Sequence, residues 1–262
     1  MNPMLSPTVV VAGLAGCFGL VIGSFLNVLI HRLPRDESPW RGRSHCPHCR
    51  RMVRWYENFP LASFACLRGR CAGCKQPISW RYPLVELATG GLGLVCVLHF
   101  GLSGAAAAYF VFLSTLLAIA CIDWDHRIIP DELSLGVAVV GLVLGATVMP
   151  QGFLRALFGA VAGAGFLWSV AALYKKTRGI EGMGFGDVKM AGMIGAFLGP
   201  VQVLLAIFVA SFLGSLWGVV LLARGGDRRT MVAFGTFLAA GAALCLFLGE
   251  PLQRWYSGLL HP

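Results

Sequence analysis

Two aspartates, Asp123 and Asp187, stand at the edges of apolar segments that hold few other charges. Asp123 lies in the segment IDWDHRIIPD (122–131), and Asp187 lies in GFGDVK (184–189). Carboxylates at membrane depth are energetically costly and tend to be functional. Two carboxylates close together cannot both ionise readily, so one keeps a proton while the other can act as a base towards water. The pair therefore predicts peptide hydrolysis by an activated water, with both aspartates as catalytic residues.

Two glycines, Gly184 and Gly186, precede Asp187 closely. Glycine lets a backbone approach a substrate strand, and irregular backbone at membrane depth is tolerated where it lines a wet cavity. We therefore expect an active-site loop at these glycines. The alternative for an aspartate near the end of a span is a helix cap or an ion pair. We assign that role to Asp125 and Asp131, with His126, Arg127 or helix starts as partners.

Four cysteines form two C-x₂-C pairs, Cys46 with Cys49 and Cys71 with Cys74, separated by 21 residues. Zinc is bound at four tetrahedral corners, and each tight C-x₂-C turn supplies two thiolates. The spacing predicts a structural zinc site. Two disulfides or free thiols are the alternatives, but a reducing cytoplasm disfavours disulfides. A segment this small also has little core of its own and gains stability from a metal.

The neighbours of this motif and the remaining cysteines receive simpler interpretations. His45 and His48 are taken as bystanders rather than ligands, and the pattern gives Cys66 no role. Glu86 is expected to pair with an arginine of the preceding loop. We expect the other cysteines to be small core residues of the apolar segments. They are Cys17, Cys96, Cys121 and Cys245.

The composition places the chain in the membrane class. Of its 262 residues, 57% are hydrophobic and only 13% are charged, with a mean hydropathy of +0.74. Soluble domains are about a quarter charged. The 34 glycines suit close helix packing in a bilayer. The net charge of +9 is concentrated in one loop, which indicates membrane topology rather than binding of nucleic acid.

The expected fold is all-α, with about eight transmembrane helices and a small cytoplasmic zinc-binding loop domain. A bilayer core requires roughly 20 apolar residues per helix. The first apolar segment lacks a basic n-region and a small-residue cleavage site, so we expect a retained helix rather than a signal peptide. The eight segments are 8–30, 83–102, 104–122, 133–149, 153–174, 187–198, 201–223 and 231–249.

The basic residues predict the orientation. Segments 31–82, 123–132, 175–186 and 224–230 hold 18 of the 21 lysines and arginines, and with eight spans they share one side. Cytoplasmic loops carry such an excess. We therefore expect the zinc loop and the aspartates to face the cytoplasm and both termini to face outward. The expected domains are a first helix (1–30), a zinc domain (31–82) and a transmembrane peptidase domain (83–262).

Several of these motifs together resemble those of the type IV prepilin peptidases, which are intramembrane aspartic peptidases of the GxGD type. The likeness extends over nearly the whole chain. It rests on GSFLNV (23–28), RLP (32–34), CPHC (46–49), ENFP (57–60), RGRC (68–71), RYPLVE (81–86), the D-x-D and PD of 123–131, and GFGDVK (184–189).

The resemblance implies a bifunctional enzyme of pilus and type II secretion systems in the bacterial inner membrane. It implies cleavage of the basic leader from prepilins or pseudopilins at the cytoplasmic face, with Asp123 and Asp187 as the catalytic pair. It further implies methylation of the new N-terminal residue, with S-adenosylmethionine as donor. The substrates would be its partners, together with the lipid bilayer.

Two other classes of protein remain as alternatives. An ion- or proton-coupled transporter would also use intramembrane carboxylates and glycine-broken spans, but no inverted halves are apparent and transport does not require a four-cysteine loop. A membrane zinc-binding scaffold without catalysis would keep the cysteines and not need the aspartates. Removal of a leader from a prepilin distinguishes the peptidase from both.

Overall fold

The computed structural model describes residues 7–180, 182–225 and 233–260. The chain divides into two compact units, residues 1–118 and residues 119–262. Each unit is described by itself.

The first unit contains two long helices that pack through small residues, α1 (Pro7–Arg32) and α3 (Arg81–Phe100), together with most of α4 (Gly104–His126). A Cβ atom added to Gly23 would lie 2.6 Å from the Cα of Glu86, and one added to Gly19 would lie 2.6 Å from the carbonyl oxygen of Thr89. Any larger residue would separate the helices. Glycine at these positions therefore allows the close helix contact that takes the place of hydrophobic burial in a bilayer.

Between α1 and α3 the chain forms a loop region with little regular structure. It contains two short 3₁₀ turns, η2 (Leu33–Arg35) and η3 (Trp55–Asn58), and the short helix α2 (Ala62–Cys66). Arg32, at the end of α1, donates hydrogen bonds to the carbonyl oxygens of Ser38, Arg41 and Gly42. Its guanidinium therefore holds the start of the loop against the helix end.

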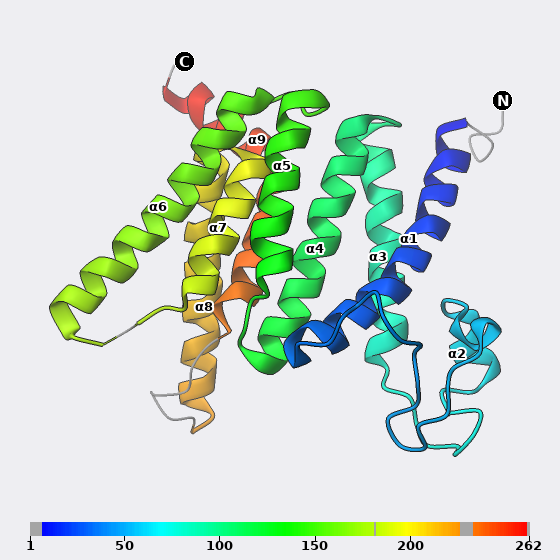
Figure 1. The fold of residues 1–262 in the computed structure, drawn as a ribbon. Coiled ribbons are helices and arrows are strands. Elements are labelled where there is room, and N and C mark those ends of the chain that lie inside the picture. Colours follow the sequence, from blue (N-terminus) through cyan, green and yellow to red (C-terminus); the bar gives the residue numbers. More distant parts are fainter. Residues whose placement is uncertain (1–6, 181, 226–232, 261–262) are drawn as a thin grey trace. The chain divides into compact units, whose positions relative to one another are not determined.

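The second unit is built around one buried helix, α7 (Phe185–Leu198) (Figure 1). Every residue from Met190 to Leu198 is buried. Four helices pack against α7: α5 (Val137–Thr147), α6 (Gly152–Arg178), α8 (Pro200–Ala223) and α9 (Phe234–Leu260). The unit also includes the end of α4 and a π-helical turn, η4 (Glu132–Gly136), which runs into α5. A helix that is enclosed on its whole circumference over these nine residues is held rigidly by dense packing.

The contact between α6 and α7 depends on glycine. A Cβ atom added to Gly159 would collide with the carbonyl oxygen of Gly195, and one added to Gly163 would collide with that of Ala191. Gly199 then ends α7 in the left-handed region, with φ 82°, and Pro200 begins α8. Proline is well suited to a first helical position because its missing N–H has no intrahelical partner there.

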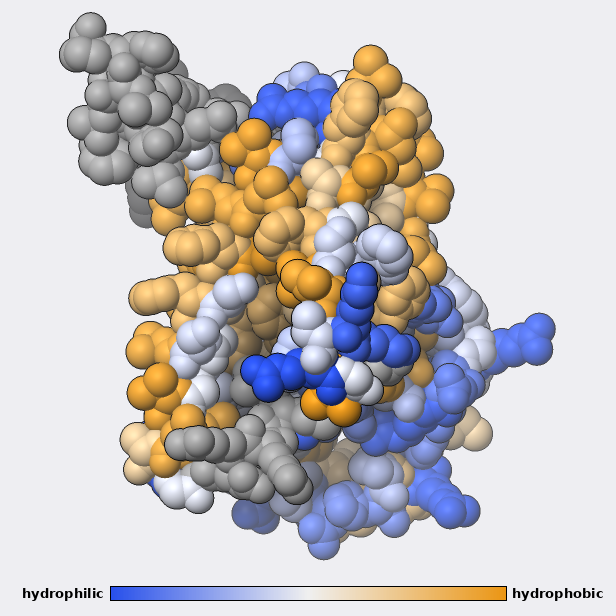
Figure 2. All heavy atoms as spheres, turned by 90° about the vertical axis from the view of Figure 1, so that its left-hand side faces the viewer, coloured by the Kyte–Doolittle hydropathy of each residue, from blue (hydrophilic) through white to orange (hydrophobic). Residues whose placement is uncertain are grey.

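The structure confirms the all-α membrane fold. Among the described residues, five helices are long and apolar enough to cross a bilayer, and shorter apolar helices lie at 132–147 and 234–249. Each of the eight predicted segments coincides with a helix, except that residues 231–232 of the last one lie outside the described part of the chain. Figure 2 shows one face of the protein, on which many hydrophobic residues are exposed. The exposed hydrophobic side chains of α6 and α8 include Phe158, Val161, Trp168, Phe208, Phe212 and Val219.

Two expectations about single residues need correction. Cys17 is exposed rather than in a core and lies on α1 among the exposed Leu14, Phe18 and Val21, whereas Cys96 and Cys245 are buried as expected. Glu86 receives its hydrogen bonds from the backbone N–H of Leu61, at 2.8 Å, and from Ser24. The loop group that satisfies this buried carboxylate is therefore a backbone amide.

The α6–α7 contact gives a prediction for stability. Gly159→Ala should destabilise the protein by about 1–3 kcal/mol, because the new methyl group must push apart two helix backbones. Gly165→Ala lies on the same helix, where an added Cβ meets nothing within 4 Å; alanine's better helix propensity should leave it neutral or stabilise it by up to about 1 kcal/mol. Thermal unfolding in detergent micelles measures the difference, and equal unfolding temperatures for the two variants would contradict the packing account.

Candidate active site and metal centre

Asp123 lies in the last turn of α4, and its carboxylate caps the start of α9. The side chain is buried, and its Oδ2 accepts a hydrogen bond from the backbone N–H of Thr236 at 2.8 Å. The backbone N–H of Gly235 is a further donor to this carboxylate. The first N–H groups of a helix have no intrahelical acceptor and carry partial positive charge. A carboxylate supplied by another helix therefore satisfies these donors.

The hydroxyl of Thr236 lies between two acceptors. Its Oγ1 is 3.3 Å from Asp123 Oδ2 and 3.1 Å from the carbonyl oxygen of Ala120. A hydroxyl has one proton to donate, so it bonds one acceptor at a time while remaining beside both. Thr236 thus connects the start of α9 to the last turns of α4 by backbone and side chain together.

Asp187 lies in the first turn of α7, directly after the glycine loop. Gly184 is the N-cap residue, with extended backbone (φ −69°, ψ 141°), and its N–H donates a hydrogen bond to the Asp187 carboxylate. Asp187 is near enough to Asp123 for their charges to interact. The two aspartates, 64 positions apart in the sequence, therefore lie near each other within the second unit.

Ile129, which belongs to the Asp123 segment, packs against Gly186 in the Asp187 segment and against Gly235 at the start of α9. A Cβ atom added to Gly186 would lie 3.0 Å from Ile129 Cβ, and one added to Gly235 would lie 2.8 Å from Ile129 Cδ1 and 3.0 Å from Asp123 Oδ2. Larger residues at either position would displace Ile129 or the carboxylate. Gly186 is therefore needed for packing next to Asp187, and Gly235 for the approach of Asp123 to α9.

An ion pair links the same two segments at the surface. Lys189 Nζ lies 2.6 and 2.8 Å from the two carboxylate oxygens of Asp131, and 5.2 Å from the ring centre of Phe185. The expected ion-pair role of Asp131 is confirmed, but its partner is Lys189, which extends from the first turns of α7, rather than His126, Arg127 or a helix start. An exposed ion pair contributes about 1 kcal/mol or less to the stability of the fold. Its structural effect is to hold Asp131 beside the first turns of α7.

The four cysteines of the C-x₂-C pairs come together in the loop region. Their sulfur atoms all lie within 4.8 Å of one another. The separations are 3.8 Å from Cys46 to Cys74 and 4.0 Å from Cys49 to Cys71. Four sulfurs at 2.3 Å from a tetrahedral zinc are about 3.8 Å apart. The cluster thus has the donor set and the dimensions of a four-coordinate metal site.

The two halves of the cluster have the same backbone structure. In the first, the N–H of Cys46 bonds the carbonyl of Arg51, and Arg50 is left-handed with φ 56°. In the second, the N–H of Cys71 bonds the carbonyl of Gln76, and Lys75 is left-handed with φ 61°. Each C-x₂-C pair is therefore a tight turn that directs two sulfurs towards a common centre.

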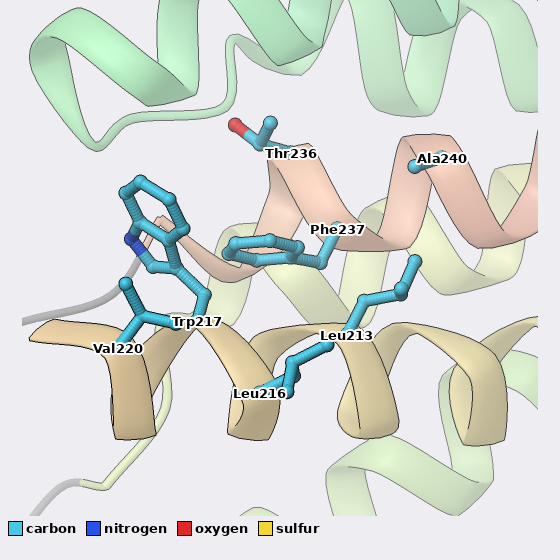
Figure 3. A pocket seen from close by; sticks show the side chains of 7 residues that line it. All are labelled: Leu213, Leu216, Trp217, Val220, Thr236, Phe237 and Ala240. Atoms are coloured by element: carbon cyan, nitrogen blue, oxygen red, sulfur yellow. The ribbon is translucent and has the colours of Figure 1, made fainter.

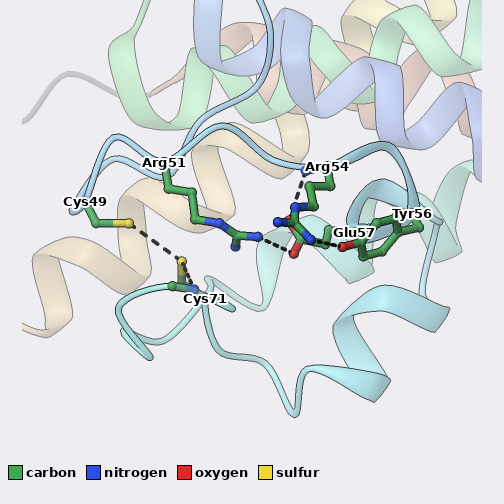
Figure 4. A network of polar contacts seen from close by, with 7 residues as sticks. Cys49, Arg51, Arg54, Tyr56, Glu57 and Cys71 are labelled. Atoms are coloured by element: carbon green, nitrogen blue, oxygen red, sulfur yellow. Dashed lines mark hydrogen bonds and ion pairs between the residues drawn. The ribbon is translucent and has the colours of Figure 1, made fainter.

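An ion pair between Arg51 and Glu57 lies beside this cluster (Figure 4). Arg51 donates to Glu57 Oε1 at 2.8 Å, and the backbone N–H of Arg54 donates to Glu57 Oε2 at 2.9 Å. The Arg54 amide, followed by the Arg51 guanidinium, lowers the pKa of Glu57. Hydrogen bonds from the backbone N–H groups of Cys74 and Gly73 lower the pKa of Cys71 to about 6. A thiol that deprotonates this readily is a good metal ligand.

Comparison with known proteins gives two family matches. Residues 17–100 match the model of the bacterial peptidase A24 N-terminal domain, and residues 110–219 match the model of the type IV leader peptidase family. No solved structure matches the chain.

Several curated proteins named prepilin leader peptidase/N-methyltransferase are similar over almost their whole length. The one from Burkholderia pseudomallei (strain 1026b) is 40% identical, covering 96% of this chain and 90% of the relative. Those from Stutzerimonas stutzeri and Aeromonas hydrophila are 38% and 37% identical, each covering 91% of both sequences.

The bond between Thr236 and Asp123 predicts a change in stability. Thr236→Val keeps the shape and the N–H but removes the hydroxyl beside a buried carboxylate, which should cost about 1–3 kcal/mol. Thr236→Ser should recover most of this loss. The matched control is Thr147→Val, because the exposed Thr147 hydroxyl bonds only a carbonyl one turn earlier in its own helix, and its effect should stay within about 0.5 kcal/mol. If thermal unfolding shows the same midpoint for Thr236→Val as for the control, the hydroxyl does not support Asp123.

Proposed function

Because the chain belongs to the type IV leader peptidase family, we propose that it removes the leader from prepilins by hydrolysis and methylates the amino group that cleavage exposes. The observation that carries the peptidase part is that Asp123 and Asp187 lie near enough for their charges to interact inside one compact unit. These carboxylates come from two different helices, and a glycine loop adjoins one of them. The relatives' names support both activities.

The proposed chemistry uses one proton shared by the pair. The ionised aspartate takes a proton from a water molecule, whose oxygen attacks the scissile carbonyl carbon, while the protonated aspartate donates a hydrogen bond to the carbonyl oxygen. The tetrahedral intermediate then collapses. The C–N bond breaks, the proton taken from the water passes to the leaving nitrogen, and the pair again holds one proton. Products are the leader's carboxylic acid and a mature chain with a free amino group.

Three features of the site support this mechanism. Both carboxylates are held at helix ends rather than on free loops. Thr236 and Gly235 fix Asp123 against α9, so this carboxylate does not need to reorganise during the reaction. We assign the glycine loop at Gly184 and Gly186 to the approach of the substrate backbone, where the missing side chains leave room.

We further propose that Cys46, Cys49, Cys71 and Cys74 hold a structural zinc ion. The sulfur separations fit tetrahedral zinc, and the two matching turns fit four-thiolate coordination. Because cysteine thiolates would occupy all four coordination positions of the zinc, the ion would stabilise the loop and have no open position for catalysis. Residues 31–82 would then form a zinc domain between a first helix (1–30) and the peptidase domain (83–262).

For methyl transfer we propose S-adenosylmethionine as the donor, on the strength of the relatives' names alone. When bound, this cofactor supplies an electrophilic methyl group to a neutral amine. The amino group freed by hydrolysis is the matching nucleophile, which places methylation after cleavage.

The protein is a multi-pass protein of the inner membrane, and we propose that its zinc loop and aspartates face the cytoplasm. The support is the distribution of charge, with 18 of 21 basic residues in the segments assigned to that side. The termini would face outward. A substrate with a basic leader would then present its cleavage site at the same face.

The aspartate pair gives the central prediction for activity. Asp123→Asn and Asp187→Asn should each reduce leader removal from a prepilin by at least about a thousandfold, because a neutral amide can neither accept the proton from water nor share one. The control is Asp125→Asn, two positions away on the exposed side of α4. This variant should remove the leader at a rate within about twofold of the parent protein. Cleavage is followed by gel mobility with purified protein in vesicles. A normal rate for either amide variant, with the same thermal unfolding as the parent, excludes that residue from catalysis.

The cysteine cluster gives a prediction for metal content. Cys46→Ser should reduce bound zinc from about one equivalent per chain to near zero after dialysis, because the site loses one of its four thiolates. Amide hydrogen exchange should become faster across residues 44–78. Cys66→Ser changes an exposed cysteine outside the cluster and should keep full zinc and slow exchange. Full zinc content in Cys46→Ser, measured by plasma mass spectrometry, would rule out this ligand set.

A further inference from the structure

The short segment that follows α4 lies against the backbone beside both aspartates. Residues 128–130 have no regular structure. Added Cβ atoms on Gly186 and Gly235 would lie 3.0 and 2.8 Å from atoms of the Ile129 side chain. Gly186 directly precedes Asp187, and the N–H of Gly235 donates a hydrogen bond to Asp123. The placement of this segment therefore affects the surroundings of both carboxylates.

The start of α9 depends on the same segment, because α8 does not pack closely against it. At the far end of the two helices, an added Cβ on Gly241 would lie 2.5 Å from the carbonyl oxygen of Ala206. Near the start of α9 a cavity of about 390 Å³ lies between them, lined by residues of both helices (Figure 3). The hydroxyl of Thr236 points away from the α8 side chains there (Figure 3). The first turn of α9 thus has room to shift towards α8 and is held on its other side by Asp123 and Ile129.

An ion pair holds the segment onto α7. The Nζ atom of Lys189 lies 2.6 and 2.8 Å from the two carboxylate oxygens of Asp131 and 5.2 Å from the ring centre of Phe185. Phe185 and Lys189 are four positions apart and share one side of the helix, whereas Asp187, two positions from each, faces another side. An effect of Lys189 on Asp187 therefore passes through the placement of α7 and of the segment that it holds.

Both ends of the segment are anchored. Arg127 is left-handed, with φ 56°, and its N–H donates to the carbonyl oxygen of Asp123 at 2.9 Å. This conformation is unfavourable for a residue with a Cβ atom and persists when the surrounding structure enforces it. At the other end, the N–H and the hydroxyl of Ser134 donate to the carbonyl oxygen of Pro130 at 3.1 and 3.0 Å. Between these two anchors, the ion pair keeps the segment against α7.

We infer that Lys189 is a positioning residue for the reaction, because its ion pair with Asp131 holds residues 128–131 against α7 and so maintains the separation of Asp123 and Asp187. The inference rests on the proposed function and adds to it a determinant of the rate. Two carboxyl groups share a proton only while they stay close, and a small misplacement slows the chemical step. An exposed ion pair stabilises one arrangement only modestly, so its loss should lower kcat by about fivefold, equivalent to about 1 kcal/mol.

The experiment measures kcat and KM for prepilin cleavage by the full-length protein in phosphatidylethanolamine–phosphatidylglycerol vesicles. Lys189→Met keeps a long, helix-favouring side chain without the charge, and Asp131→Asn removes the opposite charge. Each change should lower kcat by about fivefold, with KM within about twofold and the unfolding temperature within about 4 °C of the parent values. The protein carrying both changes should be within about twofold of either single variant, because the two changes break one contact.

Two further variants separate the ion pair from other effects of substitution. Lys189→Arg should keep kcat within about twofold of the parent, because a guanidinium can pair with both oxygens of a carboxylate. The matched control is Lys176→Met, the same substitution at an exposed position in the last turn of α6. Its kcat should also stay within about twofold of the parent, as expected of a surface change away from the site.

Four results overturn the inference while the proposed function stands. An unchanged kcat in Lys189→Met removes its basis, and Lys189→Arg that is as slow as Lys189→Met shows that the ion pair is not the cause. A double variant slowed by the product of the two single effects shows that Lys189 and Asp131 act separately. A raised KM with unchanged kcat assigns Lys189 to substrate binding. If the parent protein cleaves no prepilin, the proposed function fails as well.

Discussion

The capping of α9 by the Asp123 carboxylate is the interaction on which the site depends. A buried carboxylate needs donors, and the start of a helix needs acceptors. The two requirements are met by one contact, the 2.8 Å bond from Thr236 N–H to Asp123. Because α4 supplies the acid and α9 supplies the donors, the position of Asp123 is fixed by helix packing rather than by the short segment around it.

The second aspartate is positioned by enclosure. Asp187 lies in the first turn of α7, whose residues from Met190 onward are buried among α5, α6, α8 and α9. The close approach that makes this possible depends on glycine, at Gly159 against Gly195 and at Gly186 against Ile129. A site that holds two acids near each other at helix ends must resist their repulsion, and a rigid, densely packed helix provides that resistance.

Much of this architecture could be predicted from sequence, because its causes are local. Apolar length predicts the helices, and C-x₂-C spacing predicts the cysteine cluster, which the sulfur separations support. The role of Thr236 and Gly235 could not be predicted in this way. The bond of Thr236 to Asp123 joins positions 113 apart, and a threonine near the start of an apolar helix has no distinctive pattern. The ion pair of Lys189 with Asp131 was missed for the same reason, since only the folded second unit brings these residues together.

The most direct test of the account is whether Asp123 and Asp187 act as one unit. Single-turnover rates of leader removal can be measured for Asp123→Asn, for Asp187→Asn and for the protein carrying both changes. If one proton is shared by the pair, either change alone removes the mechanism, and the double variant should be no slower than the single variants, within about threefold. A double variant slowed by the product of the two single effects would show that the aspartates contribute independently, and would contradict the shared-proton mechanism.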